Sequence, residues 1–102
     1  MGKTRIDRKY LPVEGDTSIL YIKDKEICIA RKEGIYYAID NLCPHAGASL
    51  GMGKCAGDWI ICPMHDIRFN IKTGKGQTEK FFVRSYPIQE INQEYYLILE
   101  GE

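Results

Sequence analysis

Two short clusters of cysteine and histidine have the residue types and spacing of metal ligands. The first pairs Cys43 with His45 and the second pairs Cys62 with His65, and sixteen residues lie between His45 and Cys62. A C-x-H cluster followed by a C-x-x-H cluster supplies two thiolates and two imidazoles. These are the ligands of a 2Fe–2S cluster whose two irons are ligated unequally. The pattern therefore predicts electron transfer.

The unequal ligation has a physical consequence. Replacing two thiolates on one iron by neutral imidazoles removes two negative charges from the site, which raises its reduction potential. Because each half of the pattern supplies one cysteine and one histidine, the two cysteines can hold one iron in the interior. The two histidines then hold the other iron near the surface, and we expect the electron to leave there.

A structural zinc site is the main alternative, because zinc accepts the same ligand types. Zinc fingers usually pair cysteine with cysteine and histidine with histidine, whereas each half of this pattern mixes them. The glycine-rich first half also favours the diiron cluster. Colour separates the two readings, since an iron–sulfur protein is brown-red and a zinc protein is colourless.

The elements that must position these ligands read as β-strands throughout. Seven segments rich in Ile, Tyr, Phe and Val are separated by turn-forming residues, which predicts an all-β antiparallel sandwich or barrel. We expect hairpin loops at residues 23–25, 32–34 and 91–93. The expected strands are Ile19–Ile22, Glu26–Arg31, Ile35–Asp40, Asp58–Cys62, Arg68–Ile71, Phe82–Glu90 and Glu94–Leu99.

The segment from Asn41 to Gly57 has little strand alternation and contains four glycines. A loop of this length is uncommon in a small domain unless it is functional. It carries the first ligand pair, while the second pair occupies a tight loop between two short strands. The glycines are expected to let backbone N–H groups approach the cluster sulfurs.

Composition limits the chain to one small domain of 102 residues with balanced charge, 14 basic and 14 acidic residues. We therefore expect no nucleic-acid or membrane partner. The sequence has no membrane-length apolar stretch and no secretory start, so we expect a cytoplasmic protein with reduced thiols, monomeric when free. Cys28 is expected to be a packed strand residue, and Cys55 to have no role in the site.

The chain resembles Rieske proteins over nearly its whole length. The resemblance is carried by both ligand pairs, their order and spacing, and by the segments Lys25–Ile27, Tyr37–Ile39, Cys43–Leu50, Cys62–His65, Phe69–Asn70 and Thr73–Gly74. It implies Cys43 and Cys62 on the inner iron, and His45 and His65 on the outer iron through Nδ1. It also implies an antiparallel base with a small inserted cluster-binding subdomain at about residues 42–76.

Several differences from high-potential Rieske proteins indicate which kind of Rieske protein this chain resembles. High-potential Rieske proteins carry an extra cysteine in each ligand loop, joined as a disulfide, whereas this chain has Ala48 and Met64 there. They also have hydrogen-bonding serine and tyrosine where this chain has Ile67 and Phe69. Fewer donors to sulfur predict a potential toward the low end of the Rieske range of about −150 to +300 mV.

Three further features concern the surface near the ligands. The segment 76–80 lacks the proline that is common in the loop covering the cluster, and Asp66 stands where a glycine is common. Pro44, Leu50 and Met64 flank the ligands and are expected to form an apolar rim that excludes water and docks a partner.

The resemblance implies a soluble ferredoxin rather than an enzyme. It would take one electron from a flavin-containing reductase and deliver it to an oxygenase, such as a ring-hydroxylating dioxygenase. The chain is too short for a second domain with a mononuclear iron site. The alternative is the small Rieske-like subunit of an assimilatory NAD(P)H nitrite reductase, and retention of all four ligands favours the ferredoxin.

Overall fold

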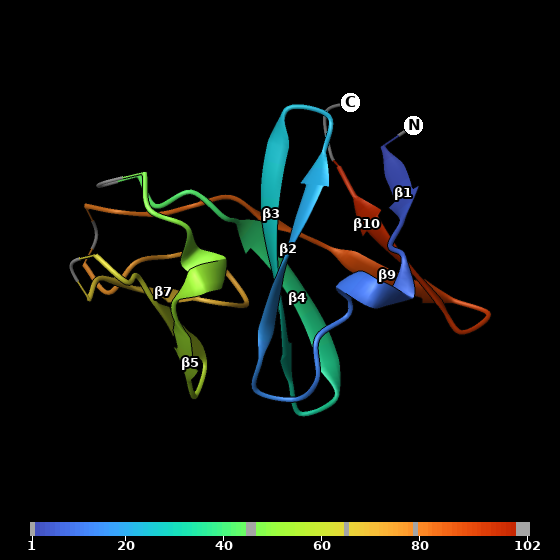
Figure 1. Cartoon of the computed structure of the whole chain (residues 1–102), viewed down its shortest axis with the longest axis horizontal. Coiled ribbons are helices and arrows are strands. Elements are labelled where there is room, and N and C mark those ends of the chain that lie inside the picture. Colours follow the sequence, from blue (N-terminus) through green and yellow to red (C-terminus); the bar gives the residue numbers. More distant parts are fainter. Residues whose placement is uncertain (1, 45–46, 65, 79, 100–102) are drawn as a thin grey trace.

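The computed structural model describes residues 2–44, 47–64, 66–78 and 80–99, which form three antiparallel sheets (Figure 1). The sheets follow one another along the long axis of a molecule measuring 38 × 28 × 20 Å. Two 3-10 helices, η1 (Arg8–Tyr10) and η2 (Leu50–Met52), accompany the strands. The strands are β1 (Lys3–Arg5), β2 (Thr17–Ile22), β3 (Lys25–Lys32), β4 (Ile35–Asp40), β5 (Lys54–Ala56), β6 (Trp59–Ile61), β7 (Arg68–Asn70), β8 (Ser85–Tyr86), β9 (Ile88–Ile91) and β10 (Glu94–Ile98).

The central sheet has the order β2-β3-β4-β8 and is covered on both faces. Strand β3 shows why, because the four successive residues Ile27–Ala30 are all buried. Successive side chains of a strand point to opposite faces. Ile27 and Ile29 therefore enter one core, and Cys28 and Ala30 enter a second core on the other face.

The first core lies between the central sheet and the outer sheet β1-β10-β9. It contains apolar residues from both sheets and from the N-terminal segment. No ligand candidate belongs to it, so this half of the molecule is a base that supports the other. Its buried members are Ile6, Leu20, Ile27, Ile29, Ala38, Tyr86, Leu97 and Leu99.

The second core joins the opposite face of the central sheet to the small sheet β5-β6-β7, on the left in Figure 1. Cys43 and Cys62 belong to this core, whose other buried members are Cys28, Ala30, Ile39, Leu50, Ile60, Phe69, Ile71 and Val83. The candidate site therefore lies at one end of the molecule, and the outer sheet, which contains β1 and β10, lies at the other end.

The predicted all-β antiparallel fold is confirmed, and the three predicted hairpin loops occur as two-residue turns at 23–24, 33–34 and 92–93. Three strand predictions were wrong. The strand β1, which pairs with β10, was not expected. The expected strand Phe82–Glu90 begins only at Ser85 and is interrupted at Pro87, which has no N–H to donate to a ladder. Residues 54–56, expected in the long loop, form β5 because β6 pairs with them.

The described helices are only three residues long, and none could cross a membrane. The subdomain boundary at about residues 42–76 stays a prediction. Backbone hydrogen bonds tie the following segment to the same half of the molecule, since Val83 donates to Gly74 and Gly76 donates to Phe81.

Candidate metal centre

The loop that begins at Cys43 is closed by two backbone hydrogen bonds. The N–H of Cys43 donates to the carbonyl of Ala48 at 2.8 Å, and the N–H of Gly47 donates back to the carbonyl of Cys43 at 2.7 Å. Gly47 has a φ of 71°, the left-handed region that glycine enters without steric cost.

The loop that begins at Cys62 repeats this arrangement. The N–H of Cys62 donates to Ile67 at 2.8 Å, and the N–H of Asp66 donates to the carbonyl of Cys62 at 3.1 Å. Asp66 has a φ of 57° and occupies the position that Gly47 has in the first loop. Its side chain is exposed, and aspartate tolerates this backbone conformation better than most residues. The two cysteines therefore start loops of the same local geometry.

Both cysteines are inaccessible to solvent, with exposed fractions of 1% for Cys43 and 0% for Cys62. They share one apolar core, and all four cysteines of the chain are described and none is in a disulfide. A chain with Ala48 and Met64 in place of the two extra cysteines was expected to have no disulfide between its ligand loops, and the four free thiols agree with this. Two buried thiols on two matching loops form a donor set suited to an iron held away from water.

The other two cysteines have different surroundings. Cys28 lies inside β3, and burial raises the pKa of its thiol to about 12, with Cys55 adding a smaller effect. Cys55 is half-buried in β5, where burial first and Asp16 second raise the pKa of its thiol. Neither thiol is set up to ionise, and the predicted packing role of Cys28 is confirmed.

His45 and His65 lie outside the described residues. Within the described ranges, no three side chains of His, Cys, Asp or Glu converge as a metal site would require. Assignment of the two imidazoles as ligands therefore stays a prediction from their spacing in the sequence.

Asn41 holds the first ligand loop in place and was not singled out from the sequence. Its side chain is fully buried, and its Nδ2 donates to Glu26 Oε1 at 3.0 Å and to Ser49 Oγ at 2.9 Å. Its Oδ1 accepts the N–H of Gly51 at 2.7 Å. The backbone of Asn41 also bonds to Glu26 and Leu50. One side chain thus joins the strand β3 to both ends of the loop.

Two glycines of the first loop, Gly51 and Gly53, are required by close packing. The N–H of Gly51 donates to Asn41, and that of Gly53 donates to Leu50 at 3.0 Å. A Cβ at Gly53 would overlap the carbonyl oxygen of Ile61, the last residue of β6. The N–H groups of Gly51 and Gly53 are thus bonded within the protein, and the expectation that the glycines let other backbone N–H groups approach the cluster sulfurs stays a prediction.

A second asparagine organises the other side of the site. Asn70, at the end of β7, accepts the N–H groups of Lys72 and Thr73 with its Oδ1, at 2.8 and 3.2 Å. The N–H of Gly74 donates to the Asn70 carbonyl at 2.8 Å. The turn accounts for Asn70 and Gly74 in the two segments, Phe69–Asn70 and Thr73–Gly74, that carry part of the Rieske resemblance.

Of the three residues expected to form the apolar rim, two are exposed, and the rim itself stays a prediction. Pro44 is exposed and Met64 has an exposed fraction of 61%, but Leu50 is fully buried, so its assignment to the rim was wrong. Leu50 begins η2 and packs against Cys43 and Cys62 instead. The surface beside Cys62 is hollowed by about 350 Å³, and the residues lining this hollow are Met52, Gly53, Lys54, Ile61, Cys62, Pro63 and Asp66.

Ile67 and Phe69 complete the apolar surroundings of Cys62. Phe69 is fully buried in the core that contains both cysteines, and Ile67 packs against the same core. Neither side chain can donate a hydrogen bond, so the core around the two thiols is apolar at both positions.

Comparison with protein families gives one match, to the Rieske [2Fe-2S] domain, over residues 5–87. The ferredoxin component of the naphthalene 1,2-dioxygenase/salicylate 5-hydroxylase systems of a Ralstonia species is 36% identical over 89 residues, covering 85% of this chain and 86% of that protein.

Solved structures agree with the fold. The ferredoxin of carbazole 1,9a-dioxygenase from Nocardioides aromaticivorans superposes with a TM-score of 0.86 and 28% identity, covering 98% of this chain and all of that one. A nitrite reductase small subunit from Mycobacterium tuberculosis has a TM-score of 0.83 at 16% identity, covering 98% of this chain and 96% of that one. At that identity the likeness shows the fold alone.

Proposed function

The chain belongs to the Rieske [2Fe-2S] domain family, and we propose from this that it is a cytoplasmic one-electron carrier rather than an enzyme. It holds one Rieske-type 2Fe–2S cluster. The proposal assigns Cys43 and Cys62 to the inner iron and His45 and His65 to the outer iron. The cluster-binding subdomain is assigned to about residues 42–76.

The observation that carries this assignment is the burial of Cys43 and Cys62 in one core, each at the start of a loop with the same hydrogen bonds. Cys28 and Cys55 lie on strands, and both have a raised thiol pKa, so they are poor sources of thiolate. The donor set therefore fits the cluster, with the thiolates on the buried side of the two loops.

When bound, the cluster supplies a store for one electron. The residues of this chain determine where that store lies and how it is surrounded. Asn41 fixes the first loop to β3, and the apolar side chains of Ile67 and Phe69 exclude water from Cys62. Because the side chains of Ile67 and Phe69 cannot donate a hydrogen bond to sulfur, this apolar site supports a potential toward the low end of the Rieske range.

The partners in this proposal are a flavin-containing reductase as donor and an oxygenase as acceptor. The supporting observation is identity above 30% with a ferredoxin component of a dioxygenase system. A nitrite reductase small subunit shares the fold at 16% identity only, which gives the alternative function less support.

Metal and sulfide analysis tests the cluster assignment. The purified protein should contain two irons and two acid-labile sulfides per chain, and the reduced protein should give an EPR signal of a Rieske centre. One zinc per chain without sulfide would contradict the assignment. Alanine at His45 or at His65 should abolish the Rieske signal, whereas Cys55→Ala should retain it.

Turnover with partner proteins tests the carrier role. NADH-driven reduction of the protein by a flavin-containing ferredoxin reductase, followed by reoxidation by an oxygenase component, should proceed with one electron per chain. Reduction that requires a sirohaem-containing nitrite reductase subunit instead would support the alternative function.

A further inference from the structure

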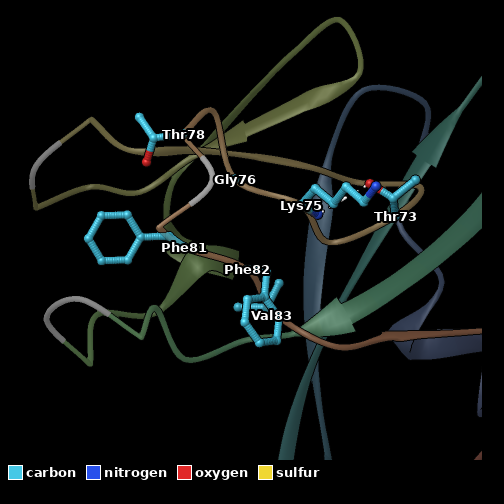
Figure 2. Close-up of a pocket in the computed structure, with 7 residues that line it drawn as sticks. All are labelled: Thr73, Lys75, Gly76, Thr78, Phe81, Phe82 and Val83. Carbon is cyan, nitrogen blue, oxygen red and sulfur yellow. Dashed lines mark hydrogen bonds between the residues drawn. The ribbon is translucent and has the colours of Figure 1, made fainter.

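A groove lies beside the candidate metal centre, on the segment that follows the second ligand loop. It has a volume of about 470 Å³, and Figure 2 shows the side chains around it. Two adjacent phenylalanines contribute to its wall. Phe81 is partly buried, whereas Phe82 has an exposed fraction of 70%, among the highest of the large apolar residues. Thr78 and Lys75 line the groove with them.

Backbone pairing joins the groove to the metal-binding half of the molecule, residues 42–84, which contains Cys43 and Cys62. Phe82 pairs with Lys75, and Gly76 pairs with Phe69 of β7. The N–H of Gln77 donates to the carbonyl of Arg68 at 2.8 Å. Phe81 packs against the core that contains Cys43 and Cys62. One wall of the groove therefore touches the core around the proposed inner-iron ligands, and the adjacent ring faces solvent.

The charge of the chain is divided unequally between its two halves. Residues 42–84 contain six basic and three acidic residues, a formal charge of +3, and the whole chain has a formal charge of +0. The remaining residues therefore carry −3. The six basic residues of the metal-binding half are Lys54, Arg68, Lys72, Lys75, Lys80 and Arg84.

One exposed lysine, Lys75, lines the groove, and a second, Lys80, precedes Phe81 in the sequence. Lys75 and Lys80 are exposed, and Lys75 has no ion pair with any carboxylate in the described ranges. Lys72 lies 3.8 Å from Asp58, a distance typical of a weak surface ion pair. An exposed aromatic ring beside an exposed lysine suits an apolar side chain flanked by carboxylates.

We propose that the groove at Phe82 is a docking site for the acidic face of a redox partner protein, which places an apolar side chain in the groove between carboxylates that face Lys75 and Lys80. This inference rests on the proposed electron-carrier function. The opposite charge of the two halves would orient the metal-binding half toward such a partner before contact.

Small redox probes test the charge of this face without a partner protein. The reduced protein is mixed with the cobalt(III)–EDTA anion or with the hexaamminecobalt(III) cation. Each cobalt(III) takes one electron from the reduced cluster and becomes cobalt(II). As salt is added, the rate with the anion should fall and the rate with the cation should rise, because screening weakens attraction and repulsion alike.

Two charge-reversal variants test whether the charge beside the groove, rather than the net charge of the protein, controls the rate with the anionic probe. Lys75→Glu should slow the anionic probe by about two- to threefold at low salt, where charges about 10 Å apart are weakly screened. Lys3→Glu changes the net charge equally but lies on β1 in the outer sheet, so its effect should be much smaller. Equal effects of the two variants, or a rate with the anion that rises with salt, would overturn the proposal.

An aromatic anion tests the groove itself. The cobalt(III) complex of bathophenanthroline disulfonate carries both sulfonates and flat rings, as the proposed partner surface carries carboxylates and an apolar group. Its rate should saturate, and Phe82→Ala should weaken the apparent affinity by about fivefold or more, since a ring loses part of its buried area. The same variant should leave the cobalt–EDTA rate unchanged.

Tyr21→Ala is the matched control, because Tyr21 is also an exposed aromatic residue but lies on β2 of the central sheet. It should alter neither probe. An unchanged affinity for the aromatic anion in Phe82→Ala would overturn the docking site. A Phe82-dependent dimer in sedimentation would do so too, because the groove would then hold a second copy.

The visible and EPR spectra of every variant separate this proposal from the proposed function. A protein without a Rieske spectrum contradicts the carrier function. A normal Rieske spectrum with no difference between Lys75→Glu and Lys3→Glu contradicts only the docking site.

Discussion

The four cysteines of this chain illustrate how surroundings decide chemistry at the residue scale. Cys43 and Cys62 begin loops in which the backbone closes on the cysteine itself, whereas Cys28 and Cys55 lie within strand ladders. Burial raises the pKa of Cys28 to about 12, which keeps its thiol protonated and inert. Position in the fold, more than residue type, therefore distinguishes Cys43 and Cys62 as ligand candidates from Cys28 and Cys55.

The ligand exchange His45→Cys should lower the reduction potential if a stable cluster forms. An anionic thiolate would replace a neutral imidazole, and the added negative charge disfavours the reduced state. Redox titration followed by EPR measures this. Cys55→Ser is the control and should leave the potential unchanged. An unaltered potential in His45→Cys would contradict the assignment of His45 as a ligand.

Replacing Asn41 with alanine should destabilise the protein by about 2–3 kcal/mol, because the buried N–H of Gly51 loses its acceptor. Calorimetry of the cluster-bound protein measures the loss as a lower Tm. Gln89→Ala, at an exposed position of β9, should change the Tm little. A similar Tm for Asn41→Ala and wild type would show that water replaces the asparagine without cost.

At the scale of elements, short turns position the site more than long strands do. The strands β5, β6 and β7 have only three residues each, so their sheet depends on the turns that flank it. Asn70 and Gly74 form the turn that joins this sheet to the segment carrying Phe82.

Gly34 and Gly74 have nearly the same backbone conformation, so alanine variants at the two positions distinguish the cost of backbone strain from the cost of overpacking. Gly74 has a φ of 82° and Gly34 a φ of 80°, but a Cβ at Gly74 would overlap the carbonyl oxygen of Val83, whereas the space at Gly34 is open. Alanine at either position should cost about 1–2 kcal/mol for the left-handed backbone.

Gly74→Ala should cost about 1–3 kcal/mol more than Gly34→Ala because of overpacking, and should also release the Phe82 segment. Thermal unfolding of the two variants measures the difference. Equal losses would mean that the Val83 backbone moves aside freely.

Glu14 links the segment before β2 to the turn between β3 and β4. Its carboxylate accepts the N–H of Gly34 at 2.9 Å and also the N–H of Glu33. Hydrogen bonds from Gly34 first and Glu33 second hold the pKa of Glu14 below its usual value of 4.5. Because the pKa is lower in the folded state, this carboxylate stabilises the fold above pH 4.5, and its contribution disappears as pH falls through the folded pKa.

Glu14→Gln should therefore lower the Tm at neutral pH, and the difference from wild type should shrink as the pH is lowered below 4.5. Glu90→Gln, an exposed carboxylate of β9, controls for the loss of a surface charge. A difference in Tm that grows in acid would contradict the assigned role of Glu14.

At the scale of the whole molecule, two cores share the central sheet but differ in what maintains them. The core of the base is closed by the outer sheet, whose strands have three to five residues, and by the longer strands of the central sheet, and it contains no ligand candidate. The other core depends on three-residue strands and contains Cys43 and Cys62. The proposed cluster would therefore cross-link the weaker half of the molecule.

Loss of the cluster should consequently unfold one half before the other. In Cys43→Ser, which removes a proposed ligand, hydrogen exchange should show loss of protection around Cys62 while the amides of β3 stay protected. Ile29→Ala, a cavity in the other core, should instead weaken protection throughout the base. Uniform loss of protection in Cys43→Ser would show that the two halves unfold as one unit.

The local pattern of the chain was enough to predict the all-β fold and the hairpin turns, and the prediction of two cysteine–histidine ligand pairs depends on the same kind of pattern. Each of these depends on neighbours in sequence: side-chain alternation, turn residues and short ligand spacing. The strand β5 was not predictable in this way, because residues 54–56 become a strand only by pairing with β6. The interruption between β8 and β9 at Pro87 could have been predicted from the sequence, because proline has no N–H to donate to a strand ladder.

The sequence by itself therefore determined the class of fold and predicts the ligand set, since both depend on residue type and spacing. Only the tertiary structure decided that Leu50 is a core residue and that Asn41 holds the first ligand loop. It also placed Phe82 and Lys75 side by side next to that core. These facts depend on contacts between distant segments, and burial and hydrogen bonding across such contacts have no signature in local sequence.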